Sequence, residues 1–254
     1  MVMYSFKDLF SKFRHNFRFS KEEIEACIIS VLAMAFIVSF DEWGYGNKFD
    51  FNVGLGNFIK AIIIMSIIIG LQLMVIKAYA LYYGYRAEFK LWWYGIIAGL
   101  ILAFFSASVS RGAALWFLAP GGIFFHHMAV HRIGWFRYGV NIMETGWTCM
   151  WGALSTIMLA VIFKLFLFVF PDSLFFEKAM IVSLWFALFS LLPIPPLLGS
   201  RVFFWSRLTF SFILGIVIGF NLLLRWSSSL LTVLILSIIV GIIVWALMLW
   251  KVES

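Results

Sequence analysis

Charged side chains are scarce in this chain of 254 residues. Asp, Glu, Lys and Arg make up 12% of it, whereas they make up about a quarter of a typical soluble domain. Hydrophobic residues make up 64%, which excludes a water-soluble surface. Two cysteines are too few for a disulfide framework or a cysteine zinc motif. Lys and Arg outnumber Asp and Glu by 19 to 12, but no aromatic-basic RNA motif occurs, so we expect no nucleic-acid partner. The composition predicts a protein whose partner is the lipid bilayer.

Long apolar runs are abundant. A membrane-spanning helix needs about 20 mostly apolar residues, and six segments approach or exceed this length. We therefore predict an all-α polytopic membrane protein with about six transmembrane helices. The predicted spans are Ala26–Phe40, Phe58–Tyr83, Trp147–Phe170, Ala179–Leu197, Leu208–Trp226 and Leu230–Trp250.

The region Trp92–Phe125 is apolar but irregular, because glycines, Pro120 and Arg111 interrupt it. If it does not cross the membrane and the N-terminus is cytoplasmic, most Lys and Arg residues lie in cytoplasmic segments. A single crossing would instead divide them almost equally between the two sides. The positive-inside rule favours the first arrangement. We predict a re-entrant or interfacial hairpin here, with both termini in the cytoplasm.

Three stretches are more specific than hydropathy: Leu71–Phe89, Gly146–Thr156 and Phe189–Phe203, the last with the run Leu-Leu-Pro-Ile-Pro-Pro-Leu. Together they resemble the site-2 protease family of intramembrane zinc metalloproteases, in particular its archaeal branch. The resemblance implies a site-2-protease-like membrane core over residues 22–207 with a short β segment. An interfacial N-terminal segment, residues 1–21, precedes this core, and a C-terminal helix pair, residues 208–254, follows it. The resemblance also implies that the protein lies in the plasma membrane of an archaeon.

The resemblance places the family's zinc site on residues that cannot bind zinc. The two histidine ligands and the general-base glutamate of the family fall on Gln72, Ile76 and Leu73, and the aspartate ligand falls on Leu198. Catalytic zinc needs about three N, O or S ligands from the protein. We therefore predict no catalytic residue at these positions and no zinc cofactor.

Histidines elsewhere leave an alternative open. His126, His127 and His131 lie close together, and on a helix His127 and His131 would have the i, i+4 spacing of helical zinc pairs. One hypothesis is a relocated zinc site in an active intramembrane metalloprotease. The other is a patch of imidazoles that meets lipid headgroups.

Candidate substrate-groove residues come from the same resemblance. An extended segment, Tyr85–Lys90, could accept a client strand by β-augmentation, and the proline-rich run lies nearby in the family. The predicted groove residues are Tyr85, Ala87, Glu88, Phe89, Pro193, Pro195 and Pro196.

Lys77 lies inside the predicted span Phe58–Tyr83, less than two turns from its cytoplasmic end. A lysine this close to the interface can extend its ammonium group to the headgroups. We expect Lys77 to do so rather than to pair inside the membrane.

These observations predict a catalytically inactive protein with a protease-like scaffold. Its expected partners are transmembrane segments of other proteins or an active protease relative. A channel or transporter is a further alternative, but the predicted spans carry few charges and show no paired broken helices.

Overall fold

Most of the chain is helical. The computed structural model describes residues 17–45, 48–109, 115–127, 140–224 and 229–253. Its elements in chain order are α2 (Lys21–Val38), β1 (Gly44–Tyr45), β2 (Lys48–Phe49), α3 (Phe51–Tyr82), β3 (Tyr85–Leu91), α4 (Trp93–Val109), β4 (Gly121–His127), α5 (Ile142–Val169), α6 (Leu174–Ser190), α7 (Leu198–Trp205), α8 (Arg207–Leu223) and α9 (Leu230–Glu253).

Local capping sets the start of the first two described helices. Ser20 precedes α2, and its Oγ accepts a hydrogen bond of 3.2 Å from the Glu23 N–H. Asp50 precedes α3, and its Oδ1 accepts from the N–H of Asn52 at 3.0 Å. Such side chains satisfy N–H groups that have no partner within the helix. At the other end of α3, Gly84 takes a φ of 82°, which glycine adopts at little cost, and the chain turns into β3.

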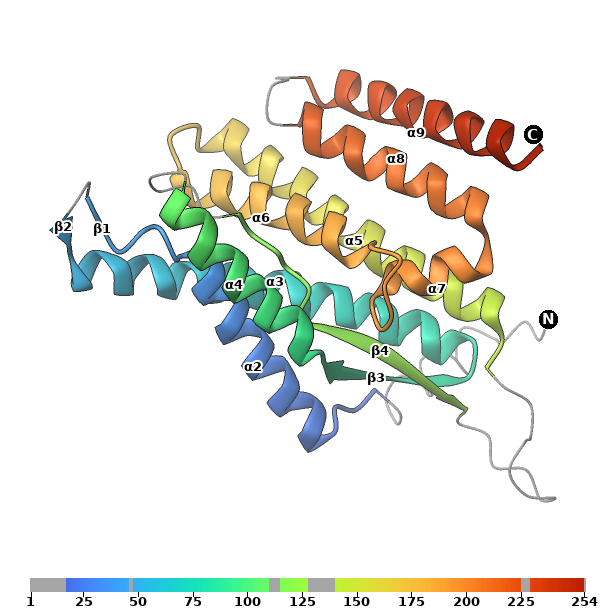
Figure 1. The fold of residues 1–254 in the computed structure, drawn as a ribbon, viewed down its shortest axis with the longest axis horizontal. Coiled ribbons are helices and arrows are strands. Elements are labelled where there is room, and N and C mark those ends of the chain that lie inside the picture. The colour runs from blue at the N-terminus through green and yellow to red at the C-terminus, as the bar shows by residue number, and fades with distance from the viewer. Residues whose placement is uncertain (1–16, 46–47, 110–114, 128–139, 225–228, 254) are drawn as a thin grey trace.

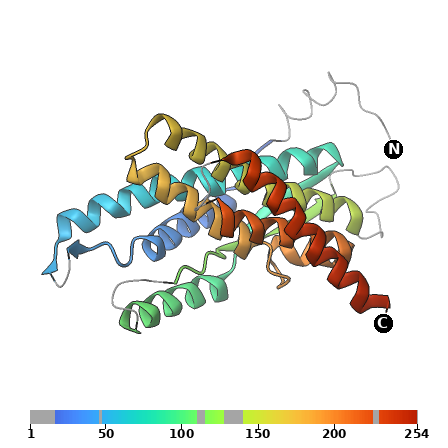
Figure 2. The same ribbon diagram turned by 90° about the horizontal axis from the view of Figure 1, so that it is seen from above.

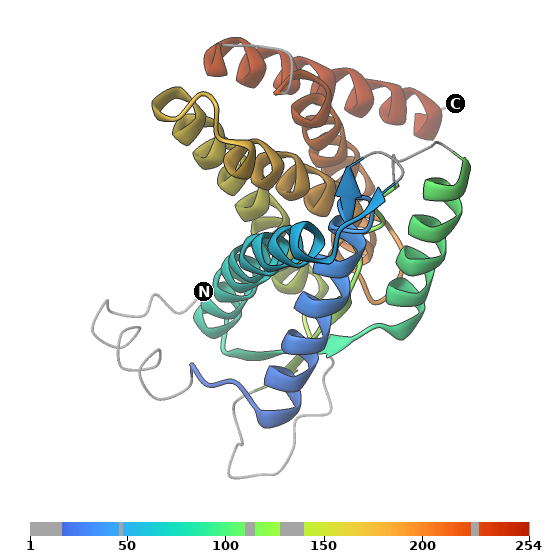
Figure 3. The same ribbon diagram turned by 90° about the vertical axis from the view of Figure 1, so that its left-hand side faces the viewer.

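The helices form layers that Figure 1 shows from the side and Figure 3 shows from one end. Helix α9 is outermost and lies on α8, and α8 contacts α6 and α7. Helix α5 lies between α6, α7 and α3, and α2 packs against α3. Small residues bring α8 and α9 together, since a Cβ on Gly219 would lie 2.7 Å from the Ser237 Cα. Close helix contact of this kind is common in membranes.

A two-stranded sheet packs against α2 and along the second half of α3. Strands β3 and β4 pair antiparallel, from Tyr85 opposite His127 to Leu91 opposite Gly121. The Trp92 N–H donates to the Pro120 carbonyl at 2.9 Å, so the chain that leaves the sheet as α4 returns to the same place. Figures 2 and 3 show α4 at the edge of the bundle. The predicted β segment is confirmed, and the two ends of Trp92–Phe125 lie side by side in the sheet, while the predicted re-entrant or interfacial hairpin stays a prediction.

Each of the six predicted spans corresponds to a helix: α2, α3, α5, α6, α8 and α9. Three of the described helices, α3, α5 and α9, are long and apolar enough to cross a membrane, and α8 is apolar but shorter. The structure thus supports a helical membrane protein, while the count of six spans stays a prediction. The 208–254 helix pair corresponds to α8 and α9, and the predicted division into domains remains untested.

Candidate functional site

The positions that correspond to the zinc motif lie on α3 and at the start of α7, two helices that both pack against α5. Gln72, Leu73 and Ile76 lie on α3, and Leu198 is the first residue of α7. A Cβ on Gly152 of α5 would lie 2.5 Å from Ile76 Cγ1 and 3.5 Å from Leu198 Cδ1. Ile76 and Leu198 therefore face the same glycine. All four motif positions are buried, with at most 7% of the residue exposed.

A very small cavity, about 10 Å³, lies beside Gln72 and Leu198 and beneath strand β4. This volume matches one water molecule. The Gln72 Nε2 has no hydrogen-bond partner within the described part of the chain. Ser190 also lines the cavity, but its Oγ donates to the Ala187 carbonyl at 2.9 Å. The polar groups at this place are thus one amide and one hydroxyl.

These residues do not fit a catalytic zinc ion. Such an ion needs about three N, O or S ligands and an open position for water, and the side chains of Leu73, Ile76 and Leu198 are hydrocarbons. Across residues 17–45, 48–109, 115–127, 140–224 and 229–253, no group of three or more His, Cys, Asp or Glu side chains could hold a metal. Among these four side chains, only the Gln72 amide could contact a metal ion.

The histidines of the alternative hypothesis lie on the sheet. His126 and His127 are the last residues of β4, and neighbouring residues of a strand point to opposite faces. The His126 Nε2 is 3.6 Å from Glu88 Oε2, and the His127 ring is 5.0 Å from the Tyr85 ring. His131 lies outside the described residues.

Four of the predicted groove residues belong to β3, and Pro196 lies against β4. Tyr85, Ala87 and Phe89 of β3 are buried, and Glu88 is half-buried beside Arg86, whose Nε is 3.1 Å from Glu88 Oε1. The proline-rich segment between α6 and α7, with Pro193, Pro195 and Pro196, also reaches the sheet. A Cβ on Gly122 of β4 would lie 2.5 Å from the Pro196 Cβ.

Tyr85 connects the sheet to the start of α5. Its hydroxyl donates to Glu144 Oε2 at 2.5 Å and accepts from the Asn141 N–H at 3.3 Å. Burial, together with the hydrogen bond to Glu144, raises the pKa of Tyr85 to about 12. The phenol therefore stays neutral and serves as a structural link.

Lys77 corrects one of our expectations. Its Nζ lies 2.8 Å from Glu23 Oε2, and only 6% of its side chain is exposed. It also donates to the Arg18 carbonyl at 3.1 Å and lies 4.1 Å from the Phe19 ring centre. Lys77 does not reach the headgroups, because Glu23 supplies the opposite charge inside the protein.

Glu23 has a second contact, which sequence reasoning missed. Its Oε1 accepts from the Phe89 N–H of β3 at 3.1 Å, so one carboxylate joins α2, α3 and the sheet. Alternate residues of a strand direct their N–H groups to the same side, so this contact occupies the edge of β3 that faces away from β4. A signal was present, since Glu23 lies on the same face of α2 as Ala26 and Ser30, which are also buried.

Comparison with known proteins finds a relative of similar sequence. A protein of Methanocaldococcus jannaschii is similar to this chain. It is named "Putative zinc metalloprotease" and is 29% identical over 210 residues, which make up 81% of this chain and 96% of that protein. No protein-family profile matches the chain, and no solved structure is significantly similar to it. Similarity over almost the whole relative supports a protease-like membrane protein.

Proposed function

We propose that this chain is a catalytically inactive member of the site-2 protease family that binds transmembrane helices of other membrane proteins. The observation that carries the proposal is the set of side chains at Gln72, Leu73, Ile76 and Leu198. Gln72 and Leu198 line one small cavity, Ile76 and Leu198 face Gly152, and Leu73 lines the wall between α2 and α3. The four side chains are three hydrocarbons and an amide. The relative of similar sequence, named as a metalloprotease, supports the family assignment.

Nearby carboxylates do not replace the missing base. A zinc-bound water is activated because the metal lowers its pKa and a carboxylate takes its proton. Glu23 is committed to Lys77 and the Phe89 N–H, and Glu144 accepts from Tyr85. Position 73, where the base is expected, holds a leucine.

A groove for a client helix lies between α2 and α3. It has a volume of about 390 Å³ and an almost entirely apolar lining, and Leu73 is part of its wall. Ser66 and Gly70 also line it, four residues apart on α3. Small residues at this spacing let a second helix approach closely in a membrane. A Cβ on Gly70 would meet no atom within 4 Å, so the groove has free space there.

An extended client at Tyr85–Lys90 is supported less well. The outer edge of β3 packs against α2 and α3, and Glu23 holds the Phe89 N–H. A strand added along this edge would have to displace that carboxylate. The helix-binding form of the proposal needs no such displacement.

Photo-crosslinking tests the binding proposal. Benzoylphenylalanine is placed at Met74, which lines the groove, or at Leu247 of α9 as a control, because both are exposed to a similar extent, 54% and 59%. The probe is a synthetic transmembrane helix with a Gly-x-x-x-Gly face in nanodiscs. We expect crosslinking at position 74 that Gly70→Leu removes, because leucine would fill the groove. Equal crosslinking at positions 74 and 247 would refute the proposal.

Metal analysis tests the loss of catalysis. Purified chain should contain far less than one zinc per molecule and should not cleave a transmembrane substrate. The alternative, an active metalloprotease built on displaced histidines, predicts stoichiometric zinc that disappears when His126, His127 and His131 are changed to alanine. That result would overturn the inactive assignment.

A further inference from the structure

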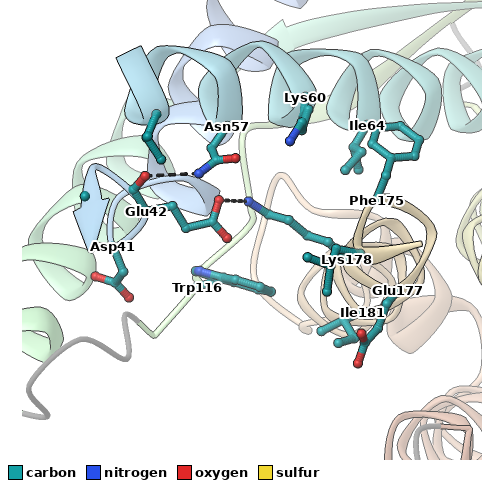
Figure 4. Close-up of a pocket in the computed structure, with 13 residues that line it drawn as sticks. Asp41, Glu42, Asn57, Lys60, Ile64, Trp116, Phe175, Glu177, Lys178 and Ile181 are labelled. Atoms are coloured by element: carbon teal, nitrogen blue, oxygen red, sulfur yellow. Dashed lines mark hydrogen bonds and ion pairs between the residues drawn. The ribbon is translucent and has the colours of Figure 1, made fainter. Parts of the chain in front are cut away.

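A second cavity lies beside the first half of α3, away from the β3–β4 sheet. It has a volume of about 560 Å³, within the usual range of small-molecule pockets. Figure 4 shows it between α3, the start of α6, the segment after α2, and Trp116. It shares no lining residue with the motif positions, so it is a separate site.

One wall of the cavity carries a fixed carboxylate. Glu42 Oε2 is 2.5 Å from Lys178 Nζ, and the Asn57 side-chain amide donates to the Glu42 carbonyl at 3.1 Å. The second carboxylate oxygen, Glu42 Oε1, accepts no hydrogen bond from the residues that the structure describes. Trp116 lies across from Glu42. A carboxylate oxygen together with an indole face is a suitable site for an ammonium group.

The α3 wall of the cavity carries a cation. Lys60 is exposed and extends from α3 into the cavity. Within the described ranges it has no carboxylate at ion-pair distance. Lys60 can therefore bind an anionic group of a ligand, while Ile64 and Ile181 supply apolar surface below it. Since Asp41 and Glu177 also line the cavity, a purely anionic ligand would meet repulsion, and a ligand with both charges suits it better.

The depth of the cavity indicates where such a ligand comes from. No charged residue lies between Lys60 and Lys77 on α3, and at 1.5 Å per residue the two are about 26 Å apart along the helix. The hydrocarbon layer of a bilayer is about 30 Å thick. Lys77 lies five residues before the end of α3 at Tyr82, so in an α3 that spans the bilayer Lys60 lies near the headgroups of the other leaflet. Tryptophan is also enriched at that depth.

We propose that this cavity binds the phosphoethanolamine headgroup of a membrane phospholipid. Lys60 contacts the phosphate, Glu42 Oε1 and Trp116 hold the ammonium group, and the acyl chains continue along the apolar wall. The proposal requires that α3 spans the bilayer, and it is independent of whether the metal site is lost.

Native mass spectrometry of the full chain in detergent tests the site. The ligands are phosphatidylethanolamine, phosphatidylglycerol and soluble glycerophosphoethanolamine, which has the headgroup without the chains. The variants are Lys60→Met, Lys60→Arg and, as a control, Lys21→Met, which removes an exposed cation at the start of α2. We expect one tightly bound phosphatidylethanolamine whose affinity falls about tenfold or more in Lys60→Met, as for the loss of a charged hydrogen bond. Lys60→Arg and Lys21→Met should bind like the wild type.

Three results would overturn the assignment. Unchanged binding in Lys60→Met would mean that the lipid lies elsewhere on the protein. Equal affinity for phosphatidylglycerol would mean that Glu42 and Trp116 do not recognise an ammonium group. Equal affinity for glycerophosphoethanolamine would assign the cavity to a soluble zwitterion instead of a lipid.

Discussion

The ion pair of Glu23 and Lys77 is buried, so loss of either partner alone should destabilise the protein. Its side chains are 2% and 6% exposed. Removing one partner of a buried ion pair leaves an uncompensated charge, which typically costs about 3–5 kcal/mol. Lys77→Met should therefore lower the free energy of unfolding by about this amount, because Glu23 then keeps only the Phe89 N–H as a donor.

The variant Glu23→Gln separates charge from hydrogen bonding. Its amide oxygen can still accept from the Phe89 N–H, so any loss of stability comes mainly from the unpaired ammonium of Lys77. In the double variant Glu23→Gln/Lys77→Met neither charge remains. Its loss should be well below the sum of the two single losses, because each single variant carries an unpaired-charge penalty that the double variant lacks.

Equilibrium unfolding in mixed micelles, monitored by circular dichroism, measures all three variants. Glu22→Gln is a matched control, because Glu22 neighbours Glu23 on α2 but is exposed, and its loss should change the free energy of unfolding by roughly 0.5 kcal/mol or less. The reasoning fails if the single variants lose less than about 1 kcal/mol, or if their losses simply add in the double variant.

Two further predictions concern other contacts. Gly152→Ala should lower the free energy of unfolding by about 1–3 kcal/mol, since its Cβ would meet Ile76. Gly70→Ala should be neutral or stabilising, because a Cβ at position 70 meets no other atom. Thermal unfolding in detergent compares the two variants, and equal effects would contradict the packing described for these glycines. The pKa of Tyr85 is raised from 10 to about 12, so the unfolded chain loses this proton first. Stability should be insensitive to this group below pH 10 and fall between pH 10 and 12. Unfolding titrations should show a shallower fall in Tyr85→Phe, and an unchanged slope would exclude the link to Glu144.

Hydropathy predicted the helices well but their ends poorly. Buried and lipid-facing residues are both apolar in a membrane, so the apolar runs in the sequence coincide with α3, α5 and α9. Helix α3 begins at Phe51, seven residues before the predicted start, because Asp50 caps a first turn of mixed composition that a search for long apolar runs leaves out. Helix α6 ends at Ser190 and not at Leu197, because Pro193 cannot continue the helix.

At the site, too, sequence motifs predicted local positions but not contacts between distant residues. Motif spacing was enough to place Gln72, Ile76 and Leu198 in one region, and the structure brings Ile76 and Leu198 to Gly152. The pairing of Glu23 with Lys77 joins residues 54 positions apart. It depends on how α2 crosses α3, and no local pattern encodes that crossing.

The buried amide of Gln72 has a consequence for the neighbouring void. A donor without a partner in the interior costs about 1–3 kcal/mol, and a leucine at this position would avoid that cost. The adjoining space, about 10 Å³, suits one water, and such a molecule would satisfy the Gln72 Nε2. That water molecule would lie beside Leu198 and hydrate Gln72, at a position where a hydrolase would activate its nucleophile.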